Sequence, residues 1–172
     1  MIKIIGCLFI IVSTSCAGYM LGDKLRKRVA DLKELQRILI SIKNELKYSI
    51  EPIELTFKKI ARDFKNPYDE ILRIAAAKIY NNEITSIDEA ISEALAEKEM
   101  DLALKDEDKL IFTEFARSLG KWNIGAQEDF FNLSFVKIEE QLNSAEDFCA
   151  KNLKMYNVMG PCIGLMLVIV LI

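Results

Sequence analysis

Long uncharged runs occupy both ends of the chain, whereas charged residues are spread through the part between them. Over residues 4–21 no side chain carries a charge. About 18 helical residues at ~1.5 Å each approach the ~30 Å thickness of a bilayer's hydrocarbon core. A second uncharged run covers residues 158–172, and a helix that starts near Met155 reaches most of the way across. The pattern predicts membrane-spanning helices over residues 1–23 and 155–172, which flank a domain over residues 24–154.

Positive charge lies on the domain side of each uncharged run. Basic residues fill most of positions 24–28 after the first run, and Lys151 and Lys154 precede the second. Because Lys- and Arg-rich flanks stay on the cytoplasmic side of a membrane, both runs place the domain in the cytoplasm. The basic positions lack interleaved aromatic side chains. Lipid headgroups or simple control of topology therefore explain them better than nucleic acid.

The N-terminal run has two alternatives to an uncleaved span. One is a cleaved signal peptide, and the other is a lipoprotein signal with Cys16 as the acylated residue and a domain facing the intermembrane space. A lipoprotein signal normally has a leucine-like residue where this chain has Ser13, and the uncharged run continues past Cys16 to Leu21. We therefore expect an uncleaved membrane anchor.

Glycines recur four residues apart on both predicted spans. Gly160 and Gly164 form one such pair, and Gly18 and Gly22 form the other. Small residues at this spacing let two helices in a membrane approach closely. The spacing predicts helix packing at these four glycines, and the alternative is that glycine is simply frequent in spans.

Between the runs, apolar residues recur at steps of three and four, which is the period of an amphipathic helix. A long helix carries Leu32, Leu35, Leu39 and Ile42 and continues the first span into the domain. Pro52 suits the first turn of a second helix, so we expect the chain to turn back in an αα-hairpin. No stretch alternates convincingly with the period of two that a half-buried strand requires.

Capping residues divide the rest of the domain into further helices. Asn66 suits the N-cap of a third helix, and Thr85 with Asp88 three residues later resembles a capping box for a fourth. A fifth helix starts near Asp106 and ends at Gly120, and a last one leads back to the second span. The sequence predicts an all-α chain, with an antiparallel bundle of about six helices in the cytoplasm and a transmembrane helix at each end.

The composition excludes several kinds of chemistry. The chain has 172 residues and no histidine, which is the commonest general base and metal ligand. Its four cysteines form no C-x-x-C pair, no glycine-rich phosphate loop occurs, and residues 106–108 lack calcium-loop spacing. The net charge of −3 offers no general attraction for nucleic acid. We expect no catalytic residue, cofactor or metal, and a protein that is not an enzyme.

Acidic residues are concentrated between positions 83 and 114, where few lysines oppose them. Such a cluster can attract a basic partner, and Asp88, Glu89 and Asp108 are its candidate contacts. The alternative is a solvated face whose carboxylates stabilise helix N-termini. Trp122 follows Gly120 in a predicted break, where it is either an exposed anchor for a partner or a core side chain.

Short motifs along the whole chain resemble one known family. The segments Glu45-Leu46-Lys47-Tyr48 and Pro52-Ile53-Glu54-Leu55 look like that family's E-[IL]-x-Y-x-x-x-P-[LI] signature. Leu104, Asp108, Leu119-Gly120 and Gln127 are similar to its next pattern, and residues 154–160 with Gly164 are similar to its closing segment. The chain thus resembles the stage III sporulation protein AB family of endospore-forming bacteria. Residues 121–125 and Met159 depart from the family pattern.

The resemblance implies a protein of the mother-cell membrane that surrounds the forespore, needed for engulfment-stage sporulation and late forespore gene expression. It implies a non-catalytic scaffold in a secretion-like channel complex, similar to the inner-membrane platform protein of type II secretion and type IV pilus machines. The expected partners are a cytoplasmic assembly ATPase, the stage III sporulation protein AA, other membrane components of the complex, membrane lipid, and further copies of the chain. The candidate ATPase contacts are Glu45, Tyr48 and Pro52, and the alternative for Tyr48 is a core side chain.

A different reading of the residues also exists. A membrane-tethered helical domain can act as a regulator that binds a soluble enzyme. Co-purification separates the two hypotheses, because a scaffold is recovered with other membrane components and a regulator with a soluble enzyme alone.

Overall fold

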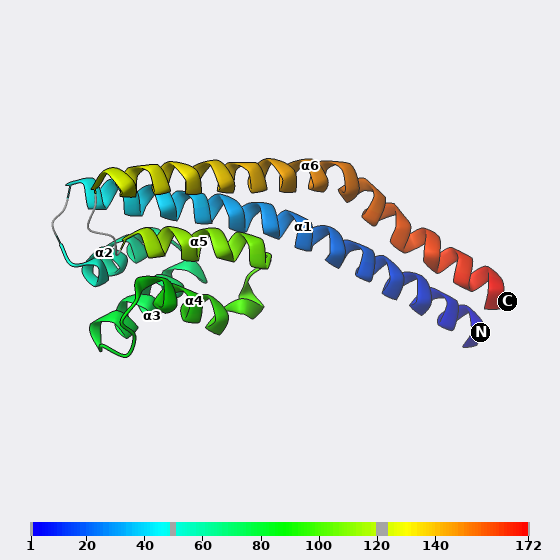
Figure 1. Ribbon diagram of the computed structural model, residues 1–172. Helices are drawn as coiled ribbons and strands as arrows, with labels where there is room; N and C mark the ends of the chain where they lie inside the picture. The colour runs from blue at the N-terminus through cyan, green and yellow to red at the C-terminus, as the bar shows by residue number, and fades with distance from the viewer. Residues whose placement is uncertain (1, 49–50, 120–123, 172) are drawn as a thin grey trace. The chain divides into compact units, whose positions relative to one another are not determined.

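The computed structural model describes residues 2–48, 51–119 and 124–171, and these residues form helices joined by turns and short loops, without a strand among them. The prediction of an all-α chain with about six helices is confirmed (Figure 1). In chain order the α-helices are α1 (Ile2–Tyr48), α2 (Ile53–Ile60), α3 (Tyr68–Tyr80), α4 (Ile87–Glu97), α5 (Asp106–Leu119) and α6 (Ile124–Leu171). Two short 3₁₀ helices, η1 (Ala61–Asp63) and η2 (Glu99–Asp101), follow α2 and α4.

The chain divides into two compact units, and each long helix contributes to both of them. The first unit comprises Met1–Val29 and Asn143–Ile172, and the second is Ala30–Leu142. In the first unit, the N-terminal part of α1 runs antiparallel to the C-terminal part of α6, so both chain ends lie at the same end of this helix pair (Figure 1). We call this pair of terminal helix segments the hairpin, which is distinct from the αα-hairpin predicted at Pro52.

The core of the second unit follows from the period of apolar residues along its helices. Leu32, Leu35, Leu39 and Ile42 of α1 have no exposed surface, because steps of three and four keep them on one face. Each fully buried leucine or isoleucine stabilises the fold by about 1.5–3 kcal/mol relative to an exposed one. Other helices contribute further buried side chains, among them Phe57, Ile71, Leu72, Ile91, Phe112, Phe115 and Ile138.

Helices α2 to α5 pack in sequence order, α2 on α3, α3 on α4, and α4 on α5. Within the second unit they lie along the pair formed by α1 and α6 (Figure 1). The rings of Phe115 in α5 and Phe131 in α6 stack at 4.9 Å between centroids, which joins the last helix to the consecutive ones. Helices α2 to α5 are therefore held together by contacts between helices that are consecutive in the sequence.

Two predicted helix starts are corrected by one residue each. The N-cap of α4 is Ser86 rather than Thr85, because the Glu89 backbone N–H donates to the Ser86 hydroxyl at 3.3 Å. Helix α3 begins at Tyr68, and the Asn66 side chain donates to the Glu70 carboxylate at 2.7 Å instead of capping the helix. Both corrections amount to one residue, which is within the usual uncertainty of a helix end.

Candidate membrane hairpin and partner surfaces

The two helices of the hairpin approach closely at a glycine seam formed by Gly18, Gly160 and Gly164. A Cβ atom added to Gly160 would lie 2.7 Å from the carbonyl oxygen of Thr14, and one added to Gly18 would lie 2.7 Å from that of Tyr156. A Cβ on Gly164 would collide with the Thr14 hydroxyl. All three glycines are buried, so backbone packs on backbone along the seam.

Two further residues complete the description of the seam. Gly22, the fourth glycine of the predicted set, is also buried. The Thr14 hydroxyl donates to the carbonyl oxygens of Ile10 and Ile11 at 3.0 and 3.1 Å. The polar atom of this side chain is therefore satisfied inside its own helix and needs no water.

Around the seam, large apolar side chains point outward from both helices. Their exposed fractions reach 68% at Phe9 and Met20 on α1, and 77% at Ile169 on α6. Large apolar side chains exposed together along two packed helices are typical of membrane or protein interaction sites. The remaining members of this surface are Val12, Tyr19, Leu21, Met155, Val158, Met159, Ile163, Leu165, Met166 and Leu167.

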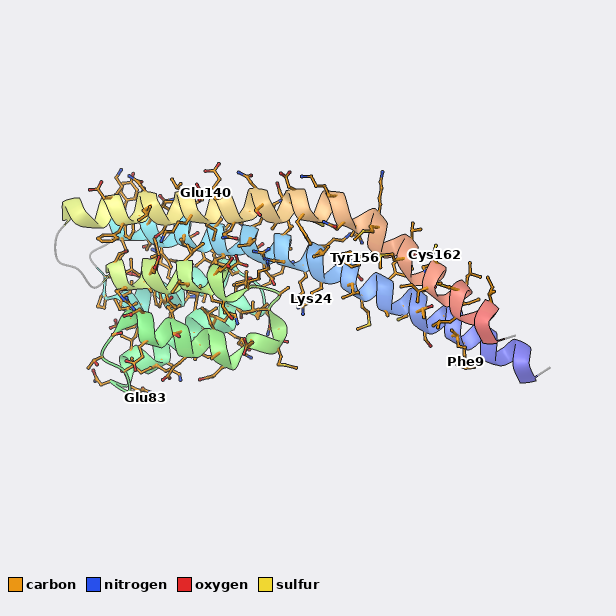
Figure 2. All side chains as sticks on the ribbon, turned by 45° about the vertical axis from the view of Figure 1, so that its right-hand side comes forward. Phe9, Lys24, Glu83, Glu140, Tyr156 and Cys162 are labelled. Carbon is orange, nitrogen blue, oxygen red and sulfur yellow. The ribbon has the colours of Figure 1, made fainter. Side chains whose placement is uncertain are left out.

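One helical segment, Asp129–Ile169, is long and apolar enough to cross a membrane, judged over the part of the chain that the structure describes. It contains most of the predicted C-terminal span. The N-terminal span, where several side chains lie outside that description, stays a prediction. Figure 2 labels Phe9 on α1 and Cys162 on α6, both within the hairpin.

The α1–α2 end of the second unit holds the predicted contacts Glu45, Tyr48 and Pro52. Tyr48 is 82% exposed, so it belongs to the surface rather than to the core. The Glu45 carboxylate accepts a hydrogen bond from Lys59 of α2 at 2.5 Å, and this bond raises the pKa of Lys59. Pro52 is exposed directly before α2. Glu45 and Tyr48 lie in the last turn of α1, and Pro52 lies directly before α2.

Asp88 and Glu89 lie in the first turn of α4 and have different surroundings. The Asp88 carboxylate accepts hydrogen bonds from the Ser86 hydroxyl at 2.6 Å and from Arg117 of α5 at 2.9 Å. These bonds, led by that of Ser86, lower the pKa of Asp88. The Glu89 side chain is exposed. Asp88 therefore links two helices, and only Glu89 of this pair is open to a partner.

Asp108 is a correction to the predicted contact surface. Its side chain has no exposed surface, and its carboxylate accepts the Lys105 backbone N–H at 2.9 Å across the first turn of α5. A carboxylate three residues into a helix is well placed to satisfy this otherwise unpaired N–H. Asp108 thus supports the helix start and is not available to a partner. Trp122 lies outside the described residues.

Most of the other acidic side chains are paired within the domain. Lys78 donates to Glu93 at 2.6 Å and lies 2.8 Å from Glu97, and Lys109 contacts Glu99 at 2.5 Å and Asp106 at 3.3 Å. The pKa of Lys78 and that of Lys109 are raised by these hydrogen bonds. Two further ion pairs are Lys98 with Glu70, and Lys137 of α6 with Glu114 of α5, the latter at 2.8 Å.

A buried polar contact around Asp31 was missed by the sequence reasoning. The Asp31 carboxylate accepts the Ala103 backbone N–H at 2.6 Å, and the Tyr68 hydroxyl donates to the Asp31 carbonyl oxygen at 3.1 Å. Burial, with the nearby Asp31 charge, raises the pKa of Tyr68. The signal was an aspartate directly before Leu32 on the buried face of α1. This contact fastens the loop before α5 and the start of α3 to the long helix.

Among the described residues, no group of three or more histidine, cysteine or acidic side chains is placed to hold a metal ion. Cys16, Cys149 and Cys162 are free thiols.

The fold defines a class of protein. Its two long helices contribute their inner parts to an all-helical domain, and their outer parts form an apolar hairpin packed through glycines. The family model of stage III sporulation protein AB matches residues 3–172, and the chain belongs to this family. Membership gives the protein a role in sporulation and confirms the resemblance drawn from its motifs.

Two comparisons with individual proteins agree with this assignment. Stage III sporulation protein AB of Bacillus subtilis (strain 168) is 25% identical over 171 residues, which cover 99% of each chain. A solved structure of stage III sporulation protein AB (SpoIIIAB) superposes with a TM-score of 0.65 at 20% identity. The match covers 72% of this chain and 96% of that chain and shows a shared fold.

Proposed function

We propose that this protein is a non-catalytic membrane scaffold of the channel-like complex between mother cell and forespore. Its hairpin spans the mother-cell membrane around the forespore, and its helical domain stands in the cytoplasm. The observation that carries the proposal is the apolar surface around the glycine seam, which is joined through both long helices to a polar, ion-paired domain. Basic residues at the domain end of the hairpin favour a cytoplasmic domain.

The scaffold couples a cytoplasmic ATPase, the stage III sporulation protein AA, to other membrane components of the complex. The surface around Glu45, Tyr48 and Pro52 is the proposed ATPase contact. Tyr48 supports this choice because a tyrosine exposed by 82% at the end of a helix offers a large, rigid, amphipathic contact. Glu89 is the second proposed contact, since its side chain is exposed while its neighbour Asp88 is engaged.

Cysteine labelling in sporulating cells tests the topology. A single cysteine is introduced as Glu89→Cys into a chain that lacks the four native cysteines, because Glu89 is exposed and Asp88 is not free. A membrane-impermeant maleimide should label it only after the membrane is opened. Labelling in intact protoplasts would overturn the cytoplasmic scaffold and favour a lipoprotein or intermembrane role.

Affinity capture from detergent-solubilised membranes tests the coupling. The full chain should recover the ATPase together with membrane components, whereas recovery of a soluble enzyme alone would favour the regulator hypothesis. Tyr48→Ala should reduce ATPase recovery by about tenfold or more, the usual loss at an aromatic anchor. Tyr80→Ala is the matched control, because Tyr80 is also exposed but lies at the end of α3. Equal recovery by both variants would remove Tyr48 from the contact.

A further inference from the structure

Four lysines with exposed side chains surround the domain end of the hairpin, and they are called the basic collar. Lys24 and Lys27 belong to α1, and Lys151 and Lys154 belong to α6. In the part of the chain that the structure describes, none of the four forms an ion pair. Asp23 nearby contacts Arg26 at 3.3 Å, and Glu146 and Arg28 also have partners. The collar therefore carries positive charge that the hairpin does not neutralise.

The glycine seam fixes the register that brings the four lysines together. Gly160 packs against the stretch from Thr14 to Gly18, and Gly18 packs against the stretch from Tyr156 to Gly160, as the contacts of an added Cβ show. Along α1, Lys24 lies about 9 Å beyond Gly18 toward the domain, at ~1.5 Å per residue. Along α6, Lys151 lies about 7.5 Å beyond Tyr156 in the same direction. Lys154 and Lys27 extend the collar to a band about 10 Å deep.

From the collar toward the chain ends, the exposed side chains follow the order of layers in a bilayer. Toward the chain ends the hairpin exposes large apolar side chains, including Phe9 and Ile169. Nearer the collar come Tyr19, which is 57% exposed, and Tyr156 at almost the same level. Tyrosines are enriched at membrane–water interfaces, where the ring meets apolar chains and the hydroxyl meets water. Figure 2 shows Lys24 and Tyr156 on the two neighbouring helices, with Phe9 further toward the chain ends.

We propose that the basic collar binds the phosphate groups of anionic phospholipids in the leaflet on the domain side. The inference rests on the proposed membrane insertion and adds a specific partner to it. Long lysine side chains can lay their methylene stems along the apolar surface while the ammonium groups reach the lipid phosphates. Clustered lysines directly beside a span attract anionic lipid, and the attraction weakens as salt screens it.

Electron paramagnetic resonance of the full chain in phospholipid vesicles tests the proposal. Spin-labelled phosphatidylglycerol and phosphatidylcholine are compared for their share of the motionally restricted lipid next to the protein. At low salt, phosphatidylglycerol should be favoured by about three- to fivefold, and ~1 M NaCl should reduce this preference to nearly one. The variant with Lys24→Gln, Lys27→Gln, Lys151→Gln and Lys154→Gln should lose the preference as well.

A control variant removes the same charge elsewhere. Lys47, Lys58, Lys65 and Lys105 are exposed in the second unit, and their replacement by Gln should leave the preference intact. Inorganic phosphate at matched ionic strength should also leave it intact, because the proposed ligand is a lipid held in the membrane. Equal association of both lipids with the unmodified protein, or an unchanged preference in the collar variant, would overturn the inference. Absence of any motionally restricted lipid would instead overturn membrane insertion itself.

Discussion

Gly18 of α1 and Gly160 of α6 face each other so closely that a Cβ atom on Gly160 would lie 3.4 Å from the Cα of Gly18. The same atom would lie 2.7 Å from the Thr14 carbonyl oxygen, which is closer than real Cβ contacts allow. Since the atoms that would be struck are backbone atoms, no side-chain rotation can relieve the collision. The hairpin therefore depends on the absence of a side chain at this position.

Gly160→Ala should separate the two helices and destabilise the hairpin by about 1–3 kcal/mol, the usual effect of overpacking. Thermal unfolding of the full chain in detergent micelles, followed by circular dichroism, measures the change. Gly6→Ala is the matched control, because nothing lies within 4 Å of a Cβ added at Gly6. Equal melting of the two variants would show that the seam does not hold the hairpin together.

Ser86→Ala should destabilise the protein by about 1 kcal/mol, because it removes the side-chain cap of α4. Thr85→Ala should have almost no effect, since Thr85 is exposed and the capping bond belongs to Ser86. The two substitutions differ by one position and test the corrected helix start directly. A larger loss in the Thr85 variant would restore the predicted cap.

Asp31→Ala should destabilise the second unit by about 1–3 kcal/mol, because the Ala103 N–H, which donates to Asp31 at 2.6 Å, loses its acceptor. Asp101→Ala removes an exposed carboxylate close to the same loop and serves as the control. The comparison uses thermal unfolding of the full chain in micelles. Similar melting temperatures for the two variants would mean that water replaces the lost carboxylate without cost.

Acid should weaken the link between α4 and α5. The pKa of Asp88 is lowered from its ordinary value of 3.8 by the Ser86 and Arg117 hydrogen bonds. A carboxyl whose pKa is lower in the folded state stabilises the fold above the unfolded pKa, and this contribution is lost as the pH falls through the folded pKa. Asp88→Asn should therefore melt below the unmodified protein at pH 7, and the difference should shrink as the pH falls past 3.8.

Glu89→Gln is the control for this pH series, because it removes an exposed carboxylate one residue away. Its melting temperature should follow that of the unmodified protein throughout. A gap between Asp88→Asn and the unmodified protein that persists unchanged at low pH would contradict the assigned role of the Asp88 charge.

Local sequence patterns predicted most of the helices, but they did not predict which carboxylates are buried or paired. The period of Leu32, Leu35 and Leu39 identified the buried face of α1, because helix geometry alone decides which side chains share a face. Asp108 was expected at the surface, yet it caps α5 from inside the core. The capping bond is local, between positions three apart, but the burial of Asp108 depends on how the first turn of α5 packs, which no local pattern contains.

The same reason applies to the acidic cluster and to Asp31. Lys78 in α3 forms ion pairs with Glu93 and Glu97 in α4. These pairs depend on how the two helices pack, which the sequence of neither helix predicts by itself. The Asp31 carboxylate reaches Ala103, far along the chain. The glycine spacing of the two spans could be read from the sequence, whereas the register between Thr14 and Gly160 required the structure.

The glycine seam joins the two ends of the chain, and this arrangement orders the events of assembly. Helices α2 to α5 make contact with their immediate neighbours in sequence, and such contacts form early because little chain must be closed into a loop. Gly18 and Gly160, by contrast, are separated by most of the chain, so their contact closes a long loop. The local contacts of α2 to α5 should therefore form before the contact between the two glycines.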